Sequence, residues 1–327
     1  MVHPALSVVL CTYNGAAFVQ EQLDSLLCQT RKPDEIVIGD DGSRDDTWSL
    51  LQTFEKRAVA LGIRTQLVRH ERNMGYVENF SSMLRRATGD VLFLCDQDDV
   101  WHWDKLATMA RRFEQDASLL LLFSNARLVD AGGSPLRHTL FEALELSEDE
   151  RTAVHQGRAF EVLLRRSMVT GATAAFRRQL VELALPVGGG WIHDEWLAVV
   201  AAAAGRVGMI EENLIDYRQH GGNQIGMRKR SFSDKWRDLV RPRQAQFLTE
   251  IERLDALHAH LAGASGNFAE ACGRIERKRA HFQRRVAFGA APRWTRLPDV
   301  IRESMRGDYR RYGTGGRSVL RDLLRRG

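Results

Sequence analysis

The first half of the chain alternates short apolar runs with segments of helical spacing, and this alternation limits the possible folds more than any other feature. Five runs are β-branched or apolar and end at polar residues or glycine, as short buried strands do. They are Ser7–Cys11, Glu35–Gly39, Thr65–Arg69, Val91–Cys95 and Leu119–Phe123. The predicted helices between them are Ala17–Cys28, Asp46–Ala60, Val77–Ala87 and Lys105–Glu114. This order predicts an α/β fold with a mostly parallel sheet and helices on both faces.

The second half is less regular. Thr170–Phe176 and Asn213–Arg218 are predicted strands, and Ile192–Ala203 is a predicted helix. From about Ser231 the pattern indicates long helices, interrupted near Gly263–Gly266 and Gly289–Pro292. We therefore predict an α/β domain over residues 1–226 and a mainly helical extension over residues 227–327.

The net charge of +5 is divided unequally along the chain. From Arg228 onward there are 24 Lys and Arg against 11 Asp and Glu, whereas the preceding part has 23 against 31. The basic side chains near the C-terminus are Arg310, Arg311, Arg317, Arg321, Arg325 and Arg326, which lie among Tyr309, Tyr312, Leu320, Leu323 and Leu324. No recognised motif accompanies this charge, so we expect no nucleic-acid partner. A solvated helical face and peripheral contact with an anionic membrane remain the two interpretations.

The chain lacks the sequence marks of export. The N-terminal segment MVHPALSVVLC has no cationic stretch before an apolar one, and no run approaches the roughly 18 apolar residues of a spanning helix. Cys11, Cys28, Cys95 and Cys272 fit no zinc or disulfide spacing. We therefore expect a cytoplasmic protein.

Polar clusters follow three of the predicted strands. They are Thr12-Tyr13-Asn14, Asp40-Asp41-Gly42-Ser43 and Asp96-Gln97-Asp98-Asp99. Ligands of open α/β sheets bind at the carboxyl ends of the strands, so these clusters should converge on one site. Three carboxylates at a buried strand end repel each other, and Mg²⁺ or Mn²⁺ would relieve the repulsion. The alternative is an acidic turn that caps the helix at Trp101–Lys105.

The first two clusters also have two interpretations each. Ser43 and Asp46 fit a capping box, and Asn14 could cap the helix that follows it. In the functional interpretation, a carboxylate of Asp40 or Asp41 accepts hydrogen bonds from a base or ribose, and Tyr13 stacks on the base.

Two further motifs lie in the second half. His193-Asp194-Glu195-Trp196 opens a predicted apolar helix, where a carboxylate can be a general base or can simply complement the helix dipole. His220-Gly221-Gly222-Asn223 places a histidine beside two glycines. Such a histidine can approach a metal or phosphate closely, or it can be structural.

The order of these motifs resembles that of family 2 glycosyltransferases, which have the GT-A fold. The similarity covers about Leu6 to Gly226, through SVVLCTYNG, Gln29-Thr30, EIVIGDDGSRDDT, Asn73-Met74-Gly75, GDVLFLCDQDDVW, TGATAAFRR, HDEW and YRQHGGN. DQDDVW together with YRQHGGN, and the tail RGDYRRYGTGGRSVLRDLL, are most similar to the rhamnosyltransferase-type branch. That branch builds O-antigens and other cell-surface polysaccharides.

The resemblance implies an inverting, metal-dependent glycosyltransferase with a nucleotide diphosphate sugar as donor, expected to be dTDP-L-rhamnose. The acceptor would be a hydroxyl of a growing cell-surface polysaccharide or a lipid-linked glycan. The implied donor-binding residues are Thr12, Tyr13, Asn14, Asp40, Asp41, Asn73 and Asp96. Asp98 and His220 would hold Mg²⁺ or Mn²⁺, and Asp194 would be the catalytic base. Related sequences often have an aromatic residue where Glu195 stands, so Glu195 is the alternative base.

Other functions remain open at this point. Asp96-x-Asp98-x-Val100 formally matches the nucleophile motif of haloacid dehalogenase-like phosphatases, with Ser124 in the position of their second motif. In that family, however, the nucleophile strand usually begins the domain. A nucleotidyltransferase would need a Gly-rich loop after the first strand, which this chain lacks. A non-catalytic module would bind a sugar nucleotide without turnover.

Overall fold

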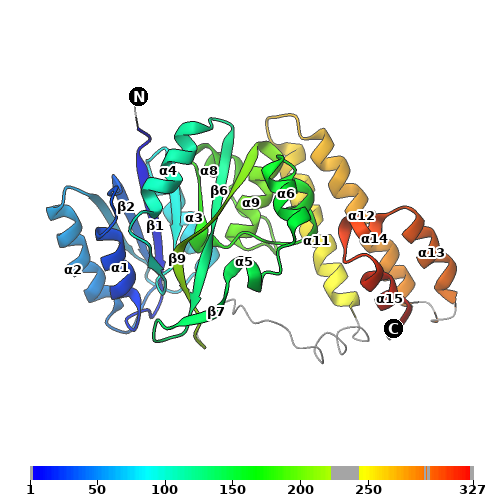
Figure 1. The fold of residues 1–327 in the computed structure, drawn as a ribbon, viewed down its shortest axis with the longest axis horizontal. Helices are drawn as coiled ribbons and strands as arrows, with labels where there is room; N and C mark the ends of the chain where they lie inside the picture. Colours follow the sequence, from blue (N-terminus) through cyan, green and yellow to red (C-terminus); the bar gives the residue numbers. More distant parts are fainter. Residues whose placement is uncertain (1–2, 222–242, 291, 293–294, 325–327) are drawn as a thin grey trace. The chain divides into compact units, whose positions relative to one another are not determined.

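The computed structural model describes residues 3–221, 243–290, 292 and 295–324, which belong to two compact units (Figure 1). The first unit comprises residues 1–159, 168–187 and 192–227, and the second comprises 160–167, 188–191 and 228–327. The predicted domain boundary after residue 226 and the predicted helix start near Ser231 lie outside the described residues.

A nine-stranded sheet forms the centre of the first unit. Its order is β3-β2-β1-β4-β8-β6-β9-β5, with β7 paired to β6. The strands are β1 (Leu6–Thr12), β2 (Glu35–Asp40), β3 (Arg64–Arg69), β4 (Val91–Cys95), β5 (Val100–Trp101), β6 (Leu119–Val129), β7 (Pro135–Thr139), β8 (Ala174–Arg177) and β9 (Arg206–Arg218). Strands β1–β4 are parallel to one another, as predicted. Beyond β4 the sheet is mixed, because β8 is antiparallel to both β4 and β6.

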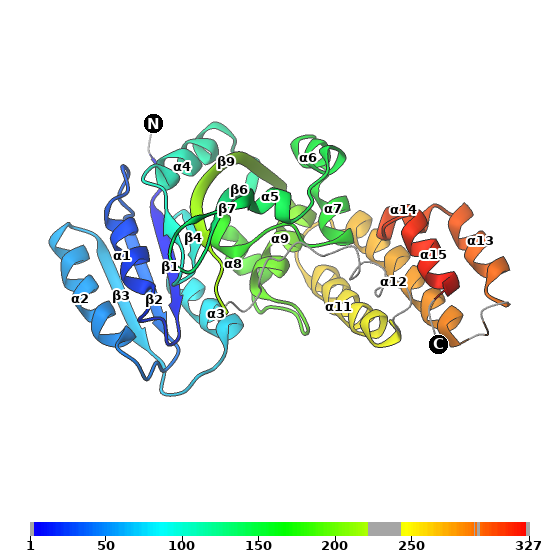
Figure 2. The same cartoon turned by 60° about the horizontal axis from the view of Figure 1, so that its bottom comes forward.

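Helices cover both faces of this sheet (Figures 1 and 2). They are α1 (Val19–Leu27), α2 (Thr47–Ala60), α3 (Tyr76–Arg86), α4 (Lys105–Gln115), α5 (Leu140–Ala143), α6 (Glu148–His155), α8 (Gln179–Ala184) and α9 (His193–Ala204). The crossovers through α1 and α2 run in one direction across the sheet, and the crossover through α3 returns. Since such crossovers are right-handed, α1 and α2 lie on one face and α3 on the other. The predicted α/β fold is confirmed.

The segment predicted as a strand over Thr170–Phe176 forms two elements instead. A 3₁₀ turn, η1 (Gly171–Thr173), precedes the short strand β8. The Thr173 hydroxyl donates to the Thr170 carbonyl at 2.7 Å, which closes the turn. A Cβ at Gly171 would lie 3.4 Å from Asp194 Oδ2, in van der Waals contact, so η1 packs directly against the first turn of α9.

The second unit is helical, as predicted for the C-terminal extension. Its helices are α7 (Ala159–Arg165), α11 (Gln244–Gly263), α12 (Ala269–Ala290), α13 (Leu297–Met305), α14 (Asp308–Tyr312) and α15 (Gly316–Leu324). Its core includes Phe288, Val300 and Tyr309. Among the described residues, no helix has the length and apolar character needed to span a membrane.

Candidate active site

Asp40 joins the loops that follow β1 and β2. Its carboxylate accepts a hydrogen bond from Thr12 Oγ1 at 3.1 Å and another from the Ser43 amide at 3.0 Å. Arg69 Nε lies 3.6 Å from the same carboxylate, which is fully buried. The Asp40 carboxylate therefore holds Thr12 and Ser43 in place at the strand ends. Its predicted contact with the donor stays a prediction.

The two predicted helix caps are wrong, because both side chains bind a neighbouring loop. Asn14 has a φ of 47°, and its Oδ1 accepts from the Arg44 amide at 2.9 Å. The Ser43 hydroxyl accepts from the Asn14 amide at 2.9 Å. Helix α2 has Asp46 at its N-cap without a side-chain hydrogen bond. These contacts tie the loop after β1 to the loop after β2.

Asp41 holds the next loop beside β2. Its two oxygens accept from the amides of Met74 and Gly75 at 2.8 and 2.9 Å. Asn73 Oδ1 accepts from the Gly75 amide at 3.0 Å. Asp41 is 2% exposed, whereas Asn73 is exposed. The loop that carries Asn73 is therefore fixed at the carboxyl ends of β2 and β3.

Tyr13 presents its ring at this edge of the sheet. The residue is 43% exposed, so it is accessible to a ligand, and an aromatic ring can stack on a planar one. Its backbone is fixed by Gln97, which accepts from the Tyr13 amide at 2.8 Å and donates to the Tyr13 carbonyl at 3.1 Å. Gln97 thus connects the loop after β1 to the segment Asp96–Asp99 after β4, which we call the acidic loop.

The acidic loop brings its carboxylates together at the end of β4. Burial raises the pKa of Asp96 to about 7, and the charges of Asp98 and Asp194 contribute to this rise. Burial, Asp98 and Asp96 raise the pKa of Asp99, whose Oδ1 accepts from the Arg218 amide at 3.0 Å. Helix α4 has Asp104 at its N-cap, so the interpretation of this loop as a helix cap is wrong.

Asp98 and His220 form the part of this site that best fits a divalent cation. Asp98 Oδ2 and His220 Nε2 lie 2.8 Å apart, within hydrogen-bond distance, so the two potential ligand atoms are neighbours. Mg²⁺ is typically held by one or two carboxylates together with substrate phosphates. Two protein ligands beside mutually repelling carboxylates fit that pattern. Gly222 and Asn223 of the same motif lie outside the described residues.

The described residues contain one compact group of three potential metal ligands, and it lies elsewhere. His281, Glu303 and Asp308 belong to the second unit. Arg284 already pairs with both carboxylates, at 2.6 Å to Glu303 and 3.2 Å to Asp308. Because the guanidinium supplies the positive charge, this group is a buried ion-pair network.

Two buried basic side chains, Lys105 and Arg218, were not predicted from the sequence. Lys105 is fully buried, donates to the Ala172 carbonyl at 2.6 Å and lies 3.8 Å from the centre of the Trp101 ring. Burial lowers its pKa to about 7, against the opposite effect of Cys95, Asp99 and Asp96. The burial of Lys105 could have been inferred from its position four residues before the buried Met109, which places it on the apolar face of α4.

Arg218 is the second missed cation. It is 2% exposed and donates to the carbonyls of Asp98 and Ala131, both at 2.8 Å, and to Glu21 at 2.6 Å. Its side chain therefore ties the acidic loop to α1 and to the turn after β6.

Replacing Arg218 with methionine is expected to lower the free energy of unfolding by about 2–4 kcal/mol, because three acceptors lose their donor. Urea unfolding at pH 7 measures this. Arg218→Lys is the control. Lysine keeps the charge but lacks the planar guanidinium, so the decrease in the free energy of unfolding should be intermediate. An unchanged unfolding midpoint for the methionine variant would contradict the assigned role.

Asp194 stands in the first turn of α9, as predicted, and its carboxylate is held in place. Oδ2 accepts from the Gly171 amide and Oδ1 from the Glu195 amide, both at 2.8 Å. Burial raises the pKa of Tyr76, and the charges of Asp194 and Glu195 add to this effect, so both carboxylates lie near that phenol. His193 is buried and stacks on Phe80 with ring centres 4.2 Å apart. The structure thus holds Asp194 near the acidic loop from a fixed backbone position.

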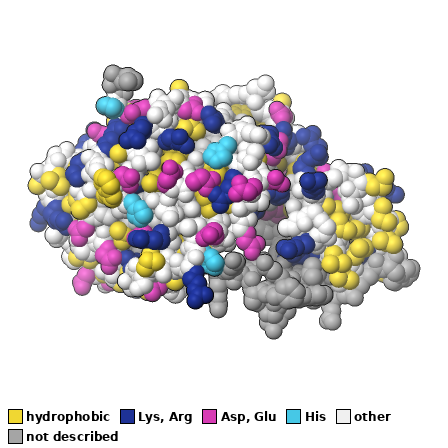
Figure 3. Space-filling model, in the orientation of Figure 1, with side chains coloured by type: hydrophobic (Ala, Val, Ile, Leu, Met, Phe, Trp, Pro, Cys, Tyr) yellow, Lys and Arg dark blue, Asp and Glu magenta, His cyan; other side chains and the backbone are white. Residues whose placement is uncertain are grey.

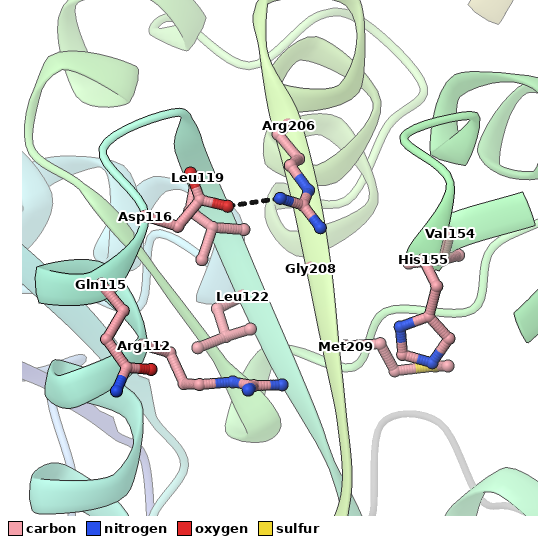
Figure 4. A pocket seen from close by; sticks show the side chains of 10 residues that line it. All are labelled: Arg112, Gln115, Asp116, Leu119, Leu122, Val154, His155, Arg206, Gly208 and Met209. Atoms are coloured by element: carbon pink, nitrogen blue, oxygen red, sulfur yellow. Dashed lines mark hydrogen bonds and ion pairs between the residues drawn. The ribbon is translucent and has the colours of Figure 1, made fainter. Parts of the chain in front are cut away.

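A pocket of about 130 Å³ lies at the opposite end of the sheet (Figure 4). Leu119 and Arg206, which begin β6 and β9, line it, and Arg206 points toward Asp116. Strand β6 runs parallel to β4, since both are antiparallel to β8. The pocket therefore lies at the amino ends of these strands. None of the predicted site residues lines it, so we do not place the donor there.

Comparison with known proteins identifies relatives for most of the chain. The family model described as "Glycosyl transferase family 2" matches residues 7–183. An uncharacterized glycosyltransferase of Nostoc sp., alr2836, is 27% identical over 223 residues, which are 67% of this chain and 66% of that protein. The Bacillus subtilis protein TuaG, named as a putative teichuronic acid biosynthesis glycosyltransferase, is 30% identical over 147 residues. That match covers 45% of this chain and 56% of TuaG.

The solved structures of S. aureus TarS residues 1–349 have a similar fold. One matches with a TM-score of 0.56 at 14% identity, covering 96% of this chain and 90% of that one. Another, in complex with UDP, matches with a TM-score of 0.54 at 16% identity, covering 93% and 79%. At this identity the likeness concerns the fold alone.

Proposed function

The chain belongs to glycosyl transferase family 2, and from this we propose that it is an inverting, metal-dependent enzyme that transfers a sugar from a nucleoside diphosphate donor to an acceptor hydroxyl. The supporting observation is the convergence of two functional groups. Asp98 contacts His220, and the charges of Asp98 and Asp194 both raise the pKa of Asp96, so the metal-binding candidate and the base candidate lie around the same carboxylate.

The chemistry requires charge stabilisation at the leaving group and a base at the acceptor. Cleavage of the anomeric C–O bond leaves negative charge on the diphosphate, which a cation held by Asp98 and His220 would stabilise. Asp194 accepts the proton of the acceptor hydroxyl as its oxygen attacks the anomeric carbon. The Gly171 amide keeps that carboxylate in one orientation. A single displacement from the face opposite the leaving group inverts the anomeric centre.

The nucleoside is proposed to lie against the loops at the ends of β1, β2 and β3. Tyr13 offers an exposed ring, and Thr12, Asn14, Asp41 and Asn73 shape the loops around it. The fixed backbone conformation of these loops favours recognition by preorganised groups. Asp96 is proposed to lie near the ribose. A haloacid dehalogenase-like phosphatase would leave Asp194 without a role.

We propose dTDP-L-rhamnose as the donor and a cell-surface polysaccharide or lipid-linked glycan as the acceptor, on the resemblance of the DQDDVW and YRQHGGN segments. An acceptor of this kind would place the enzyme at the cytoplasmic face of the inner membrane. Peripheral attachment through the C-terminal helices would bring it there.

A thermal-shift series with dTDP-, UDP- and GDP-sugars tests the donor. With Mn²⁺ present, dTDP-L-rhamnose is expected to raise the Tm most, because a ligand at 100 times its Kd stabilises the fold by about 2.7 kcal/mol. EDTA should reduce the shift. Stronger protection by a GDP-sugar would overturn the rhamnosyl assignment. Donor binding without transfer to any acceptor would favour a non-catalytic module, and phosphate release from small phosphomonoesters would favour a phosphatase.

A further inference from the structure

Helix α13 exposes an apolar stripe. Leu297, Ile301 and Met305 follow each other at four-residue spacing, with exposed fractions of 50, 50 and 84%. This spacing places the three side chains along one side of the helix. Val300 and Glu303, on another side, are buried. The side of α13 with Val300 therefore packs into the core of the second unit, whereas the side with Leu297, Ile301 and Met305 remains exposed.

Helix α15 extends the exposed apolar surface. It contacts α13 and exposes Leu320 and Leu324, by 45 and 39%. Figure 3 shows hydrophobic side chains gathered over helices α13–α15. We call Leu297, Ile301, Met305, Leu320 and Leu324 the apolar patch. Contiguous exposed apolar surface of this kind marks a protein or membrane contact.

Exposed arginines accompany the apolar patch. Arg302 lies on α13, Arg306 caps its C-terminus, Arg310 lies on α14 and Arg317 on α15. Arg302 pairs with Asp299 at 3.2 Å and Arg306 with Glu303 at 3.1 Å. No ion pair joins Arg310 or Arg317 to an acidic side chain in the part of the chain that the structure describes. The surface around the patch therefore carries unbalanced positive charge.

The structure also shows which basic and aromatic groups of the tail are not at this surface. Lys278, Arg285 and Arg296 are buried, and Arg285 pairs with Asp322 at 2.7 Å. Tyr309 and Tyr312, which the sequence places among the C-terminal arginines, are buried as well. Arg325 and Arg326 lie outside the described residues. The total charge of the tail therefore overstates the charge available to a partner.

We propose that the apolar patch enters the interfacial region of an anionic lipid bilayer, with Arg310 and Arg317 at the headgroups. Amphipathic helices bind in this way, with their apolar side chains at the boundary of headgroups and acyl chains and their basic side chains attracted to anionic lipid. The positive charge around the apolar patch favours an anionic bilayer over a neutral apolar partner. The proposal rests on the proposed function only in expecting an acceptor at the membrane.

Flotation of the full chain with lipid vesicles tests this surface. Wild type is expected to float with vesicles of phosphatidylcholine and phosphatidylglycerol, and salt should reverse this only in part, because apolar burial is not screened. The double variant Ile301→Ser/Met305→Ser should bind at least about tenfold more weakly, since two buried apolar side chains are lost. Arg310→Gln/Arg317→Gln should weaken binding to the anionic vesicles alone. Leu248→Ser is the matched control, because Leu248 is 46% exposed on α11 of the same unit.

The outcomes separate this proposal from its alternatives. Unchanged flotation of the Ile301→Ser/Met305→Ser variant, with an unchanged Tm, would overturn it. Failure of wild type to float, together with self-association that the same variant abolishes in light scattering, would assign the patch to a second copy of this chain and also overturn it. Nucleotide protection in the thermal-shift series is the independent readout of the proposed function. If wild type floats but no nucleotide raises its Tm, the proposed membrane-binding surface stands and the proposed transferase function is contradicted.

Discussion

Replacing Asp194 with asparagine is expected to lower kcat by at least about 100-fold and to leave nucleotide affinity nearly unchanged. General bases typically contribute about 10²- to 10⁴-fold, and asparagine keeps the shape of the side chain while removing its basicity. The Gly171 amide donates to Asp194 Oδ2 at 2.8 Å, and an asparagine at this position can still accept this bond through its amide oxygen. The substitution therefore removes a proton acceptor and keeps the bond from Gly171, whereas the bond from the Glu195 amide to the second oxygen is lost. Initial rates under saturating donor and acceptor measure the effect.

Glu195→Gln is the matched control, because Glu195 is the next residue of the same helical turn and also lies near Tyr76. The Glu195→Gln variant should lose much less activity than Asp194→Asn. A dead Glu195→Gln enzyme beside an active Asp194→Asn enzyme would transfer the role of base to Glu195. Full activity of both variants would reduce the HDEW segment to the start of a helix, and another base would then be needed.

Replacing Asp98 with alanine is expected to abolish transfer and to weaken diphosphate binding. The substitution removes one of two atoms that face each other at 2.8 Å, so His220 alone would remain to hold a cation against the phosphates. Mn²⁺-dependent protection by a nucleoside diphosphate in thermal shift measures the binding, and product formation measures the transfer. Both should fall to the level of wild type in EDTA.

Asp149→Ala is the charge-matched control for this experiment. Asp149 is exposed in the first turn of α6, so its removal changes the net charge of the first unit equally without touching the acidic loop. Its activity and metal response should equal those of wild type. Full activity of Asp98→Ala in EDTA would remove the metal assignment and would leave the leaving group to be stabilised by protein side chains.

The elements that could be predicted from the sequence are those with a strong local pattern. Strands β1–β4 and helices α1–α4 follow from apolar residues at the periods of strand and helix, which depend on neighbouring residues alone. The convergence of the loops after β1, β2 and β4 was also predictable, because parallel strands end at one edge of a sheet. Asp98 beside His220 shows that two motifs far apart in the chain meet there.

The partner of each polar side chain depends on the tertiary structure. Asp40 and Asn14 bind neighbouring loops, and Lys105 and Arg218 enter the core beside the carboxylates. Helical periodicity likewise cannot show which apolar side of α13 is buried, since the spacing of Leu297, Ile301 and Met305 suits a core as well as a surface. The partners of a charged or apolar group are chosen by segments distant in sequence, and the burial that they impose decides whether that group is structural, catalytic or exposed for binding.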